Sequence, residues 1–358
     1  ALVSGSDGIH HAAPEAVLFQ NLHTLNGGAA GRTHRVLQCA GKYLCLPKCK
    51  LLELCIYNPL SFFIIIQSES ERLPLMTYRI IHNHPCDIGE GPLWWNHKLW
   101  FVDGQYFAVR TVCPETGEER IFSADAVITS LNPMADGKLL LTRLDGAFSV
   151  LDETTGKILP FIFKSGNLIL HFNDSKVGPD GCLYVGNRRD MPNDSRKINP
   201  DAGLYKLSPD GSFVRMATDF AAINGLDWSP DGKTLYVVDS AKATLRVFAF
   251  GETLAEMCSI PLEGHADGMT VDAEGYPLCA LWAPGKIVRV DPKTGNTIET
   301  YQMPCCVSSC AFGGDNFDRL YVTTPAYKKD PVSEYDGRTF QLDIGRRGKA
   351  PYIFGKKP

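Results

Sequence analysis

Four short stretches of the chain carry side chains that could bind one metal ion together. Each contributes one oxygen-bearing side chain, and the four residues are Glu90, Asn173, Asn224 and Asp267. All four offer hard oxygen ligands, and none is a thiolate or an imidazole. Asn224 lies in an apolar run, residues 220–226, where a buried amide without a partner costs roughly a few kcal/mol. The set predicts one divalent cation, with Ca²⁺ favoured and Mg²⁺, Mn²⁺ or Zn²⁺ as the alternatives.

The segments that would position these residues form a repeat. From Thr77 onward, short β-like runs alternate with turn dipeptides such as Asp-Gly, which favour hairpins because glycine tolerates positive φ. One apolar run recurs six times, and its leading residues are Leu99, Leu139, Leu183, Leu235, Leu278 and Leu320. Their separations are 40, 44, 52, 43 and 42 residues. A period in the forties with several short strands per unit is typical of propeller blades. The sequence therefore predicts an all-β fold, a six-bladed β-propeller.

The four oxygen-bearing residues occupy similar positions within their repeats. Glu90 lies nine residues before its leading leucine, Asn173 lies ten, and Asn224 and Asp267 each lie eleven. Equivalent positions of a propeller form a ring around its axis, and the residues ahead of the second strand belong to the innermost strand. We therefore expect the four side chains to converge at one mouth of the central channel. For any one of them alone, an ordinary position at a turn or strand end is the alternative.

The two ends of the repeat region predict how the ring closes. Residues 78–82 precede the first inner strand and are expected to pair, as an outer strand, with residues 339–342 of the last repeat. We divide the chain into an N-terminal extension, residues 1–75, and the propeller, residues 76–358. The extension has no sustained periodicity, so we expect it to be poorly structured or to be no part of the working domain.

The composition disfavours several classes of partner. The net charge of −4 and the pI near 6.2 provide no general attraction for nucleic acids or anionic membranes. The apolar run of residues 51–66 is interrupted by polar residues and is shorter than the roughly 20 residues of a membrane-spanning helix. No secretory signal opens the chain, and the 12 cysteines show no paired zinc-site spacing. We expect a cytoplasmic protein that is a monomer or a weak homo-oligomer.

The motifs around the four residues resemble those of one known family. This is the senescence marker protein/gluconolactonase/luciferin-regenerating enzyme family, to which the regucalcin-like lactonases belong. The similar segments are residues 88–94, 172–176, 224–229, 267–272, 311–314 and 320–323. The resemblance extends from about residue 78 to the C-terminus and does not cover residues 1–75. It implies a six-bladed propeller that uses one catalytic divalent cation to hydrolyse sugar lactones.

The resemblance also implies roles for single residues. Glu90, Asn224 and Asp267 would be the metal ligands, and Asp267 would also act as the general base. Asn173 would contact the substrate or a water molecule bound to the metal. The cation would polarise the lactone carbonyl and activate water for attack.

Departures from the family pattern concern the substrate. His171 stands where the family has an arginine that grips the lactone, and histidine is shorter and only partly charged near neutral pH. Ser175 and Ala266 replace a glycine and a proline of the family motifs. Arg188 and Arg189 are candidates to supply the missing charge, with solvated loop positions as the alternative. The expected substrate-binding residues are therefore Asn173, His171, Arg188 and Arg189.

Three functions from different classes are compatible with these residues. The first is a divalent-metal-dependent hydrolase that opens a small-molecule sugar lactone, as a gluconolactonase does. The second is a calcium-dependent esterase or phosphotriesterase, because paraoxonase-like and diisopropyl-fluorophosphatase-like propellers also bind calcium through Glu, Asn and Asp. The third is a calcium-binding propeller without enzymatic activity, because a fold does not determine a function. The chain contains no Gly-x-Ser-x-Gly motif, which disfavours a serine hydrolase.

Overall fold

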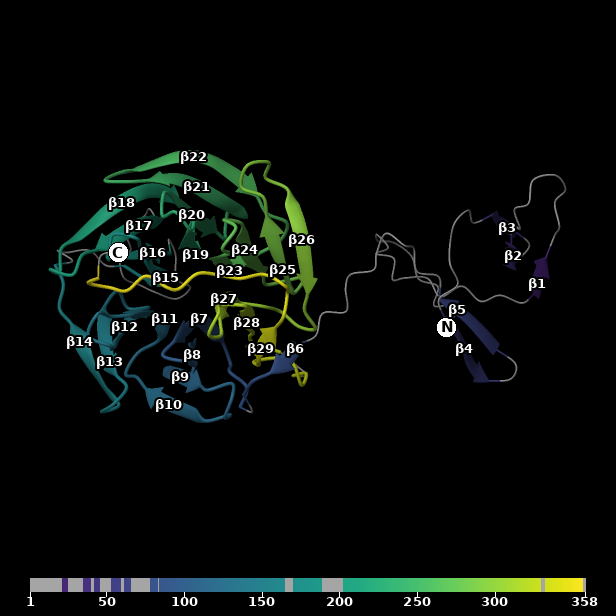
Figure 1. The fold of residues 1–358 in the computed structure, drawn as a ribbon, viewed down its shortest axis with the longest axis horizontal. Helices are drawn as coiled ribbons and strands as arrows, with labels where there is room; N and C mark the ends of the chain where they lie inside the picture. Colours follow the sequence, from purple (N-terminus) through teal and green to yellow (C-terminus); the bar gives the residue numbers. More distant parts are fainter. Residues whose placement is uncertain are drawn as a thin grey trace, which may run out of the picture. The chain divides into compact units, whose positions relative to one another are not determined.

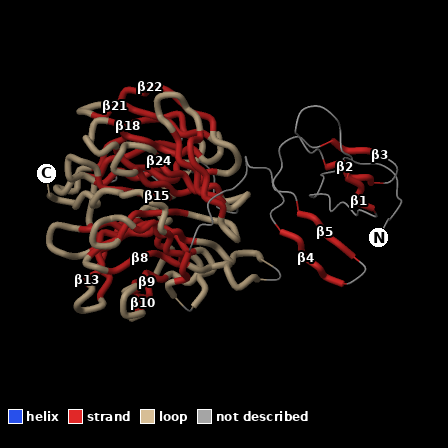
Figure 2. Tube along the Cα trace, turned by 45° about the vertical axis from the view of Figure 1, so that its right-hand side comes forward, coloured by secondary structure: helices blue, strands red, loops and turns tan. Residues whose placement is uncertain are grey.

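The computed structural model divides the chain into two units, Ala1–Leu75 and Met76–Pro358. The described residues of the second unit are 78–82, 84–164, 170–188, 202–329 and 332–356, and five strands are described in the first unit. All the regular elements of these residues are strands (Figure 2). Within the same residues there is no helix long and apolar enough to cross a membrane.

The first unit contains two small antiparallel sheets. One has the strand order β1-β2-β3, and the other pairs β4 with β5. The strands are β1 (Asn21–Thr24), β2 (Arg35–Cys39), β3 (Lys42–Cys45), β4 (Glu53–Asn58) and β5 (Ser61–Ile65). The other residues of this unit, on which the expectation of a poorly structured extension mostly falls, lie outside the described residues.

The described residues of the second unit form six antiparallel four-stranded sheets, arranged as blades around a central axis (Figure 1). The innermost strands are β7 (Gly89–Trp95), β11 (Ile128–Pro133), β15 (Phe172–Val177), β19 (Ile223–Trp228), β23 (Ala266–Val271) and β27 (Ser309–Gly313). The second strands are β8 (Lys98–Asp103), β12 (Leu139–Arg143), β16 (Leu183–Asn187), β20 (Thr234–Asp239), β24 (Pro277–Leu281) and β28 (Arg319–Thr323). Each leading leucine of the sequence repeat lies on a second strand, so the predicted all-β, six-bladed propeller is confirmed.

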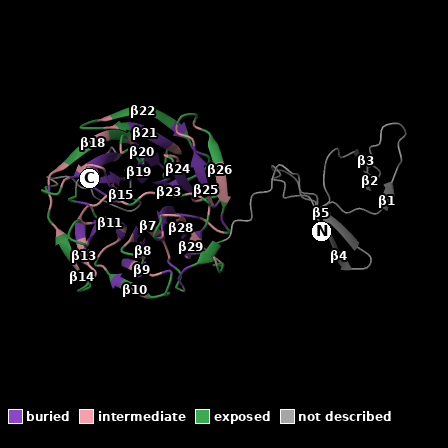
Figure 3. Cartoon of the chain, viewed as in Figure 1, coloured by how far each residue is buried: buried purple, intermediate pink, exposed green. Residues whose placement is uncertain are grey.

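The two outer strands of each blade complete the sheets. The third strands are β9 (Ala108–Val112), β13 (Phe148–Asp152), β17 (Ala202–Leu207), β21 (Thr244–Phe250), β25 (Lys286–Val290) and β29 (Thr339–Leu342). The outermost strands are β10 (Glu119–Ser123), β14 (Lys157–Phe161), β18 (Phe213–Phe220), β22 (Leu254–Pro261), β26 (Thr297–Gln302) and β6 (Tyr78–Ile80). Burial decreases from the inner strands to the rim of the ring (Figure 3).

The hydrophobic core lies between neighbouring blades rather than inside one blade. One buried cluster joins blades 4 and 5, for example, by packing Val238 and Leu245 against Met269 and Cys279. Comparable clusters join the other adjacent blades. A single sheet of this kind cannot bury both of its faces, so each blade depends on its two neighbours. The ring therefore supports the inner strands as one body.

The ring closes where the sequence predicts. β6 pairs antiparallel with β29, and Phe340 lies opposite Ile80 in this register. His82 is only 3% exposed, and its Nε2 lies 2.9 Å from the hydroxyl oxygen of Thr339. The start of the propeller sequence thus completes the last blade, which confirms the predicted closure.

Residues 343–356, here called the C-terminal strap, cross the face of the ring (Figure 1). The strap forms backbone hydrogen bonds with four blades, through Ala135, Gly181, Ala273 and Phe317. These four residues follow the ends of innermost strands, whereas the predicted oxygen donors lie where innermost strands begin. The strap therefore covers the end of the channel opposite the predicted site.

Candidate metal and substrate site

Each predicted oxygen donor lies in a β-bulge, or directly before one in the case of Glu90, at the start of an innermost strand. In β7, Glu90 pairs with Val102 while Leu93 pairs with Trp100, so the inner strand has one residue more than its partner. The same shift occurs in β15, β19 and β23, at the positions of Asn173, Asn224 and Asp267. A bulge bends the strand locally and redirects its side chains. These four blades thus share one local device that turns a polar residue toward the channel.

The two remaining blades lack such a donor. β11 also has a bulge, but the residue in it is Thr129. β27 pairs regularly with β28 from Ser309 onward. A ring of strong oxygen donors is therefore present on four of the six blades.

The four donors line one cavity of about 720 Å³. Other polar residues that line it are Gln105, Thr129, Asp174, Arg188, Ser240, His265 and Tyr327. Part of the wall is apolar and includes Ile88, Val127, Leu144 and Trp282. A large cavity with an apolar wall and a few convergent polar groups is the usual form of a small-molecule site. The structure thus brings Glu90, Asn173, Asn224 and Asp267 together, while their individual roles stay predictions.

Hydrogen bonds order the donors within the cavity. The amide nitrogen of Asn224 donates to a carboxylate oxygen of Asp267, and the side chains of Glu90 and Asp267 share a hydrogen bond. The backbone N–H of Gly91 donates to Glu90 Oε2 over 2.9 Å. The amide nitrogen of Asn173 donates to the backbone oxygen of Ile223 over 2.9 Å, which orients Asn173 from the neighbouring blade.

Three carboxyl groups crowd together in this cavity, where Asp267 is buried and Glu90 and Asp174 are half-buried. Burial and the negative charges of Asp267 and Asp174 raise the pKa of Glu90 well above its usual range. Burial and Asp174 raise the pKa of Asp267 to about 7, against a lowering effect of Arg188. Burial raises the pKa of Asp174 to about 6, although Lys176 opposes this shift. The cavity therefore has more negative charge than the side chains around it compensate.

This donor set fits one hard divalent cation. Glu90, Asn224 and Asp267 supply two carboxylates and an amide oxygen, which are ligands that Ca²⁺ and related ions prefer. Among the described residues, no three His, Cys, Asp or Glu side chains are arranged to hold a metal ion by themselves. The fit therefore depends on Asn224 as a third ligand, and a bound cation would offset the charge that raises the carboxyl pKa values.

Two buried aspartates hold the backbone just ahead of the donors. Asp103, at the end of β8, accepts hydrogen bonds from the N–H groups of Asp87 (3.2 Å) and Ile88 (3.4 Å), which lead to Glu90. Asp239, at the end of β20, accepts hydrogen bonds from the N–H groups of Ala221 and Ala222, each over 3.0 Å, which lead to Asn224. Sequence analysis missed both aspartates. The sequence pattern could have identified them, because each lies at the same distance after the leading leucine of its repeat.

Ser175, which stands where the family motif has a glycine, forms hydrogen bonds to a neighbouring blade. Its hydroxyl lies 2.5 Å from Ser130 Oγ and 2.6 Å from Thr142 Oγ1, and Asn132 Nδ2 donates to it over 2.9 Å. Ser175 is 4% exposed and lies on β15, whereas its three partners belong to blade 2. A glycine at this position would leave these buried polar groups with fewer partners. Ser175 therefore links the inner strand of blade 3 to blade 2.

The predicted substrate-binding residues are placed differently from one another. His171 is 3% exposed and is not among the described residues that line the cavity. Its backbone oxygen accepts a hydrogen bond from Arg188 N over 3.0 Å. Arg188 lines the cavity and acts electrostatically on Asp267. Arg189 lies outside the described residues. Asp174 also lines the cavity, although sequence analysis gave it no role.

Comparisons with known proteins identify the family. Residues 88–326 match the SMP-30/Gluconolactonase/LRE-like region family. The chain belongs to this family. Regucalcin of Xenopus laevis is 31% identical over 298 residues, which are 75% of this chain and 94% of that protein. A Bacillus subtilis protein named "Putative sugar lactone lactonase YvrE" is 28% identical over 283 residues, 75% of this chain and 94% of that protein.

Solved structures of family members have the same fold. A calcium-binding protein, regucalcin, from Agrobacterium tumefaciens has a TM-score of 0.68 at 23% identity, covering 78% of this chain and 98% of that chain. A luciferin-regenerating enzyme also has a TM-score of 0.68, at 24% identity, covering 78% of this chain and 99% of that chain. The family match ends at residue 326 and therefore does not include the C-terminal strap.

Proposed function

We propose that this protein is a divalent-metal-dependent lactonase that opens sugar lactones. The observation that carries the proposal is the convergence of Glu90, Asn224 and Asp267 from three different blades in one cavity, where burial raises the pKa of both carboxyl groups. These three residues would hold the cation, with Ca²⁺ as the favoured ion. Membership of a family that includes gluconolactonases supports the reaction class.

The chemistry divides between the cation and the protein. When bound, the cation supplies Lewis-acid polarisation of the lactone carbonyl and stabilises negative charge on its oxygen. Asp267 takes the proton from the attacking water as the general base. Asn173 is held by Ile223 of the next blade and orients the substrate. Transfer of the proton from Asp267 to the leaving alkoxide then completes ring opening.

Arg188 provides the positive charge on the substrate side of the cavity. His171 stands at the family's arginine position but is buried away from the cavity lining. Arg188 lines the cavity and follows the end of β16 directly. A guanidinium presents several donors in one plane and can bind two oxygens of a substrate at once. We therefore assign to Arg188 the contact with the lactone oxygens that His171 cannot make.

The test is hydrolysis of a panel of aldonolactones by wild type, Asp267→Asn and Asp315→Asn. Asp315 is a matched control because its side chain is 77% exposed and, among the described residues, forms an ion pair only with the exposed His97. Wild type should lose activity in EDTA and regain it with Ca²⁺, Mg²⁺, Mn²⁺ or Zn²⁺. Asp267→Asn should lose about 10²–10⁴-fold in kcat, as expected for a general base. Full activity of Asp267→Asn, or activity indifferent to chelation, would contradict the proposal.

The apolar part of the cavity wall supports a second candidate, a calcium-dependent esterase or phosphotriesterase. Ile88, Val127, Leu144 and Trp282 could accept an aryl or alkyl group that a sugar lactone lacks. The two candidates are separated by comparing kcat/KM for an aldonolactone with that for an aryl ester and an aryl phosphotriester. If metal raises thermal stability while no panel member is hydrolysed, the non-enzymatic calcium-binding function is favoured instead.

A further inference from the structure

Asp227 is a buried carboxylate that contacts three innermost strands at once. It lies on β19, and its side chain is 3% exposed. Its Oδ2 accepts hydrogen bonds from Lys176 Nζ on β15 over 3.2 Å and from Thr270 Oγ1 on β23 over 3.2 Å. Oδ2 also accepts a hydrogen bond from Val271 N over 3.1 Å. One side chain thus joins the strands that carry Asn173, Asn224 and Asp267.

The residues that meet at Asp227 lie at the same sequence distance from the oxygen donors of their strands. Lys176, Asp227 and Thr270 each lie three residues after the oxygen donor of their own strand. Successive side chains of a regular strand alternate between its faces, but the extra residue of each bulge places residues three apart on the same side. Lys176, Asp227 and Thr270 form a layer of their own along the channel. At about 3.3 Å per residue, this layer lies roughly 10 Å from the oxygen donors. A layer of polar contacts thus lies directly below the site.

The C-terminal strap completes this layer with a second lysine. Lys349 Nζ lies 2.6 Å from Asp227 Oδ1, across 122 residues of sequence, and the Lys349 side chain is 17% exposed. The remaining space around this ion pair is small, with cavities of about 40 and 30 Å³. Such volumes have room for only a few water molecules. The strap therefore fills this end of the channel and places one ammonium group on the carboxylate that joins the strands.

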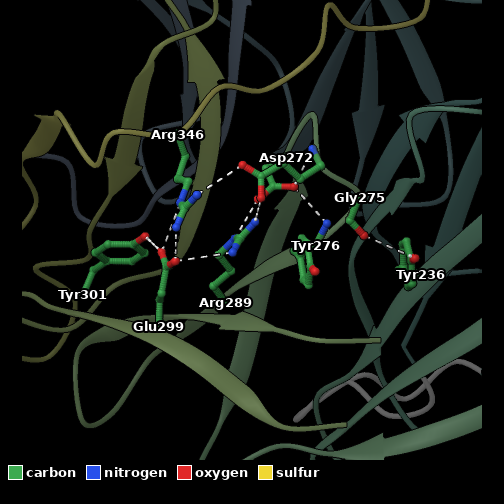
Figure 4. Close-up of polar contacts among 9 residues, drawn as sticks. Tyr236, Asp272, Gly275, Tyr276, Arg289, Glu299, Tyr301 and Arg346 are labelled. Atoms are coloured by element: carbon green, nitrogen blue, oxygen red, sulfur yellow. Dashed lines mark hydrogen bonds and ion pairs between the residues drawn. The ribbon is translucent and has the colours of Figure 1, made fainter. Parts of the chain in front are cut away.

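A second anchor holds the strap at blade 5, outside the channel (Figure 4). Arg346 pairs with Glu274 over 3.1 Å and with Glu299. Glu299 also pairs with Arg289, which is 3% exposed and lies 2.7 Å from Asp272. This network fixes the direction of the strap before Lys349 enters the channel. The two anchors can be removed separately, because Arg346 makes no contact with Asp227 among the described interactions.

We propose that Lys349 and Asp227 are positioning residues for the site. Their ion pair sets the spacing of β15, β19 and β23 and thereby the spacing of Asn173, Asn224 and Asp267. Without Lys349, a buried carboxylate loses its nearest cation and is left to Lys176, so the inner strands rearrange around it. Contacts behind metal ligands are expected to matter because a small displacement weakens a site. The consequence for metal binding rests on the proposed function, whereas the positioning of the strands does not.

The experiment compares three variants of the full chain with wild type. Lys349→Met removes the ammonium group and retains much of the side chain's volume. Lys356→Met is the matched control, because Lys356 lies on the same strap, is exposed and makes no described ion pair. Arg346→Met releases the outer anchor only. Ca²⁺ affinity is measured by calorimetry, and hydrogen exchange of β15, β19 and β23 is measured in the metal-free protein together with its melting temperature.

We expect Lys349→Met to weaken Ca²⁺ binding about 10–100-fold, as for loss of a residue that supports metal ligands. It should also speed hydrogen exchange at the donor-bearing starts of the three strands. Lys356→Met should match wild type, and Arg346→Met should lower the melting temperature with Ca²⁺ affinity unchanged. Unchanged Ca²⁺ affinity in Lys349→Met, or equal losses in Lys349→Met and Arg346→Met, would overturn the proposal. If wild type binds no divalent cation, the proposed function fails, and hydrogen exchange alone decides the positioning: faster exchange supports it and unchanged exchange overturns it.

A double-mutant cycle covers the case in which Lys349→Met does not fold. Asp227→Asn and the double variant Asp227→Asn/Lys349→Met are compared in hydrogen exchange of the same strands. If the two residues act as one pair, the double variant should exchange no faster than Asp227→Asn alone. Faster exchange in the double variant than in Asp227→Asn would overturn the proposal.

Discussion

The two ends of the channel contain buried carboxyl groups on the neighbouring innermost strands β23 and β19, yet their pKa values shift in opposite directions. At the open end, burial and neighbouring acids raise the pKa of Asp267 to about 7. At the strap end, burial also acts to raise the pKa of Asp227, but Lys176 and Lys349 outweigh it and lower the pKa to about 2. Burial alone therefore does not decide the charge of a channel residue. Nearby positively charged side chains decide it. At the open end, the protein supplies too little positive charge to lower the pKa of Asp267.

The largest expected effect follows from removing the charge at the strap end. Asp227→Asn leaves the ammonium groups of Lys176 and Lys349 in the channel without their carboxylate. We expect a loss of about 3–5 kcal/mol in the free energy of unfolding at pH 7, because a buried pair is broken on one side. Urea denaturation measures this, with the exposed Asp315→Asn as control. If Asp227→Asn loses no more stability than a typical surface substitution, the ion pairs of Asp227 do not distinguish the strap end from the open end.

The same substitution has a defined pH dependence. The folded-state pKa of Asp227 is about 2, and the unfolded value is near 4, so its contribution is fully present above about pH 4. It is lost as the pH falls from about 4 through about 2. The difference in stability between wild type and Asp227→Asn should therefore narrow over this interval, as followed by acid-dependent urea denaturation. A constant difference down to pH 2 would contradict the depressed pKa.

Asp174 at the open end should show the opposite sign. Its folded-state pKa is about 6, so the metal-free native state binds a proton more tightly than the unfolded state and loses stability as the pH rises from about 4 to about 6. Asp174→Asn should stabilise the metal-free protein by about 1–3 kcal/mol at pH 8 and not at pH 4. Thermal unfolding at both pH values measures this. Stabilisation of equal size at both values would exclude ionisation as its cause.

Added cation should affect the open end alone. At a free Ca²⁺ concentration of about 100 Kd, we expect wild type to gain about 2.7 kcal/mol of stability. Asp267→Asn should gain little, because it loses a charged ligand, whereas Lys356→Met on the strap should gain as much as wild type. Differential scanning fluorimetry with and without EDTA follows these gains. Equal gains in wild type and Asp267→Asn would place the cation elsewhere.

The smallest effect on cation binding is expected between the two ends, at Ser175. Ser175→Ala removes a hydroxyl that contacts Ser130, Asn132 and Thr142 in the buried space between blades 2 and 3. The cost should be about 1–3 kcal/mol, because these groups lose a buried partner. Ca²⁺ affinity should not change, since the carboxylates and amides of the site remain. A marked loss of Ca²⁺ affinity in Ser175→Ala would instead show that Ser175 contributes to the metal site.

Much of the fold could be predicted because it depends on local and repeated patterns. The leucines of the six second strands were identified from spacing, and the closing strand was predicted within residues 78–82 because the ring has to close; the structure has it at Tyr78–Ile80. The convergence of Glu90, Asn173, Asn224 and Asp267 was expected from the same repeat. His171 shows where this reasoning stops. Its position in a motif suggests a substrate contact, which stays a prediction, whereas the burial of His171 at 3% exposure is set by packing and could not be predicted from the motif.

The amino-acid sequence by itself determined the period, the number of blades and which residues begin the innermost strands, because hydrophobic spacing and turn residues act over short distances. Only the tertiary structure decided which charges meet. Lys349 reaches Asp227 across 122 residues, and this contact, with that of Lys176, separates the pKa of Asp227 from that of Asp267. The physical reason is that pKa values depend on burial and on nearby charges, and both are set by segments that the sequence holds far apart.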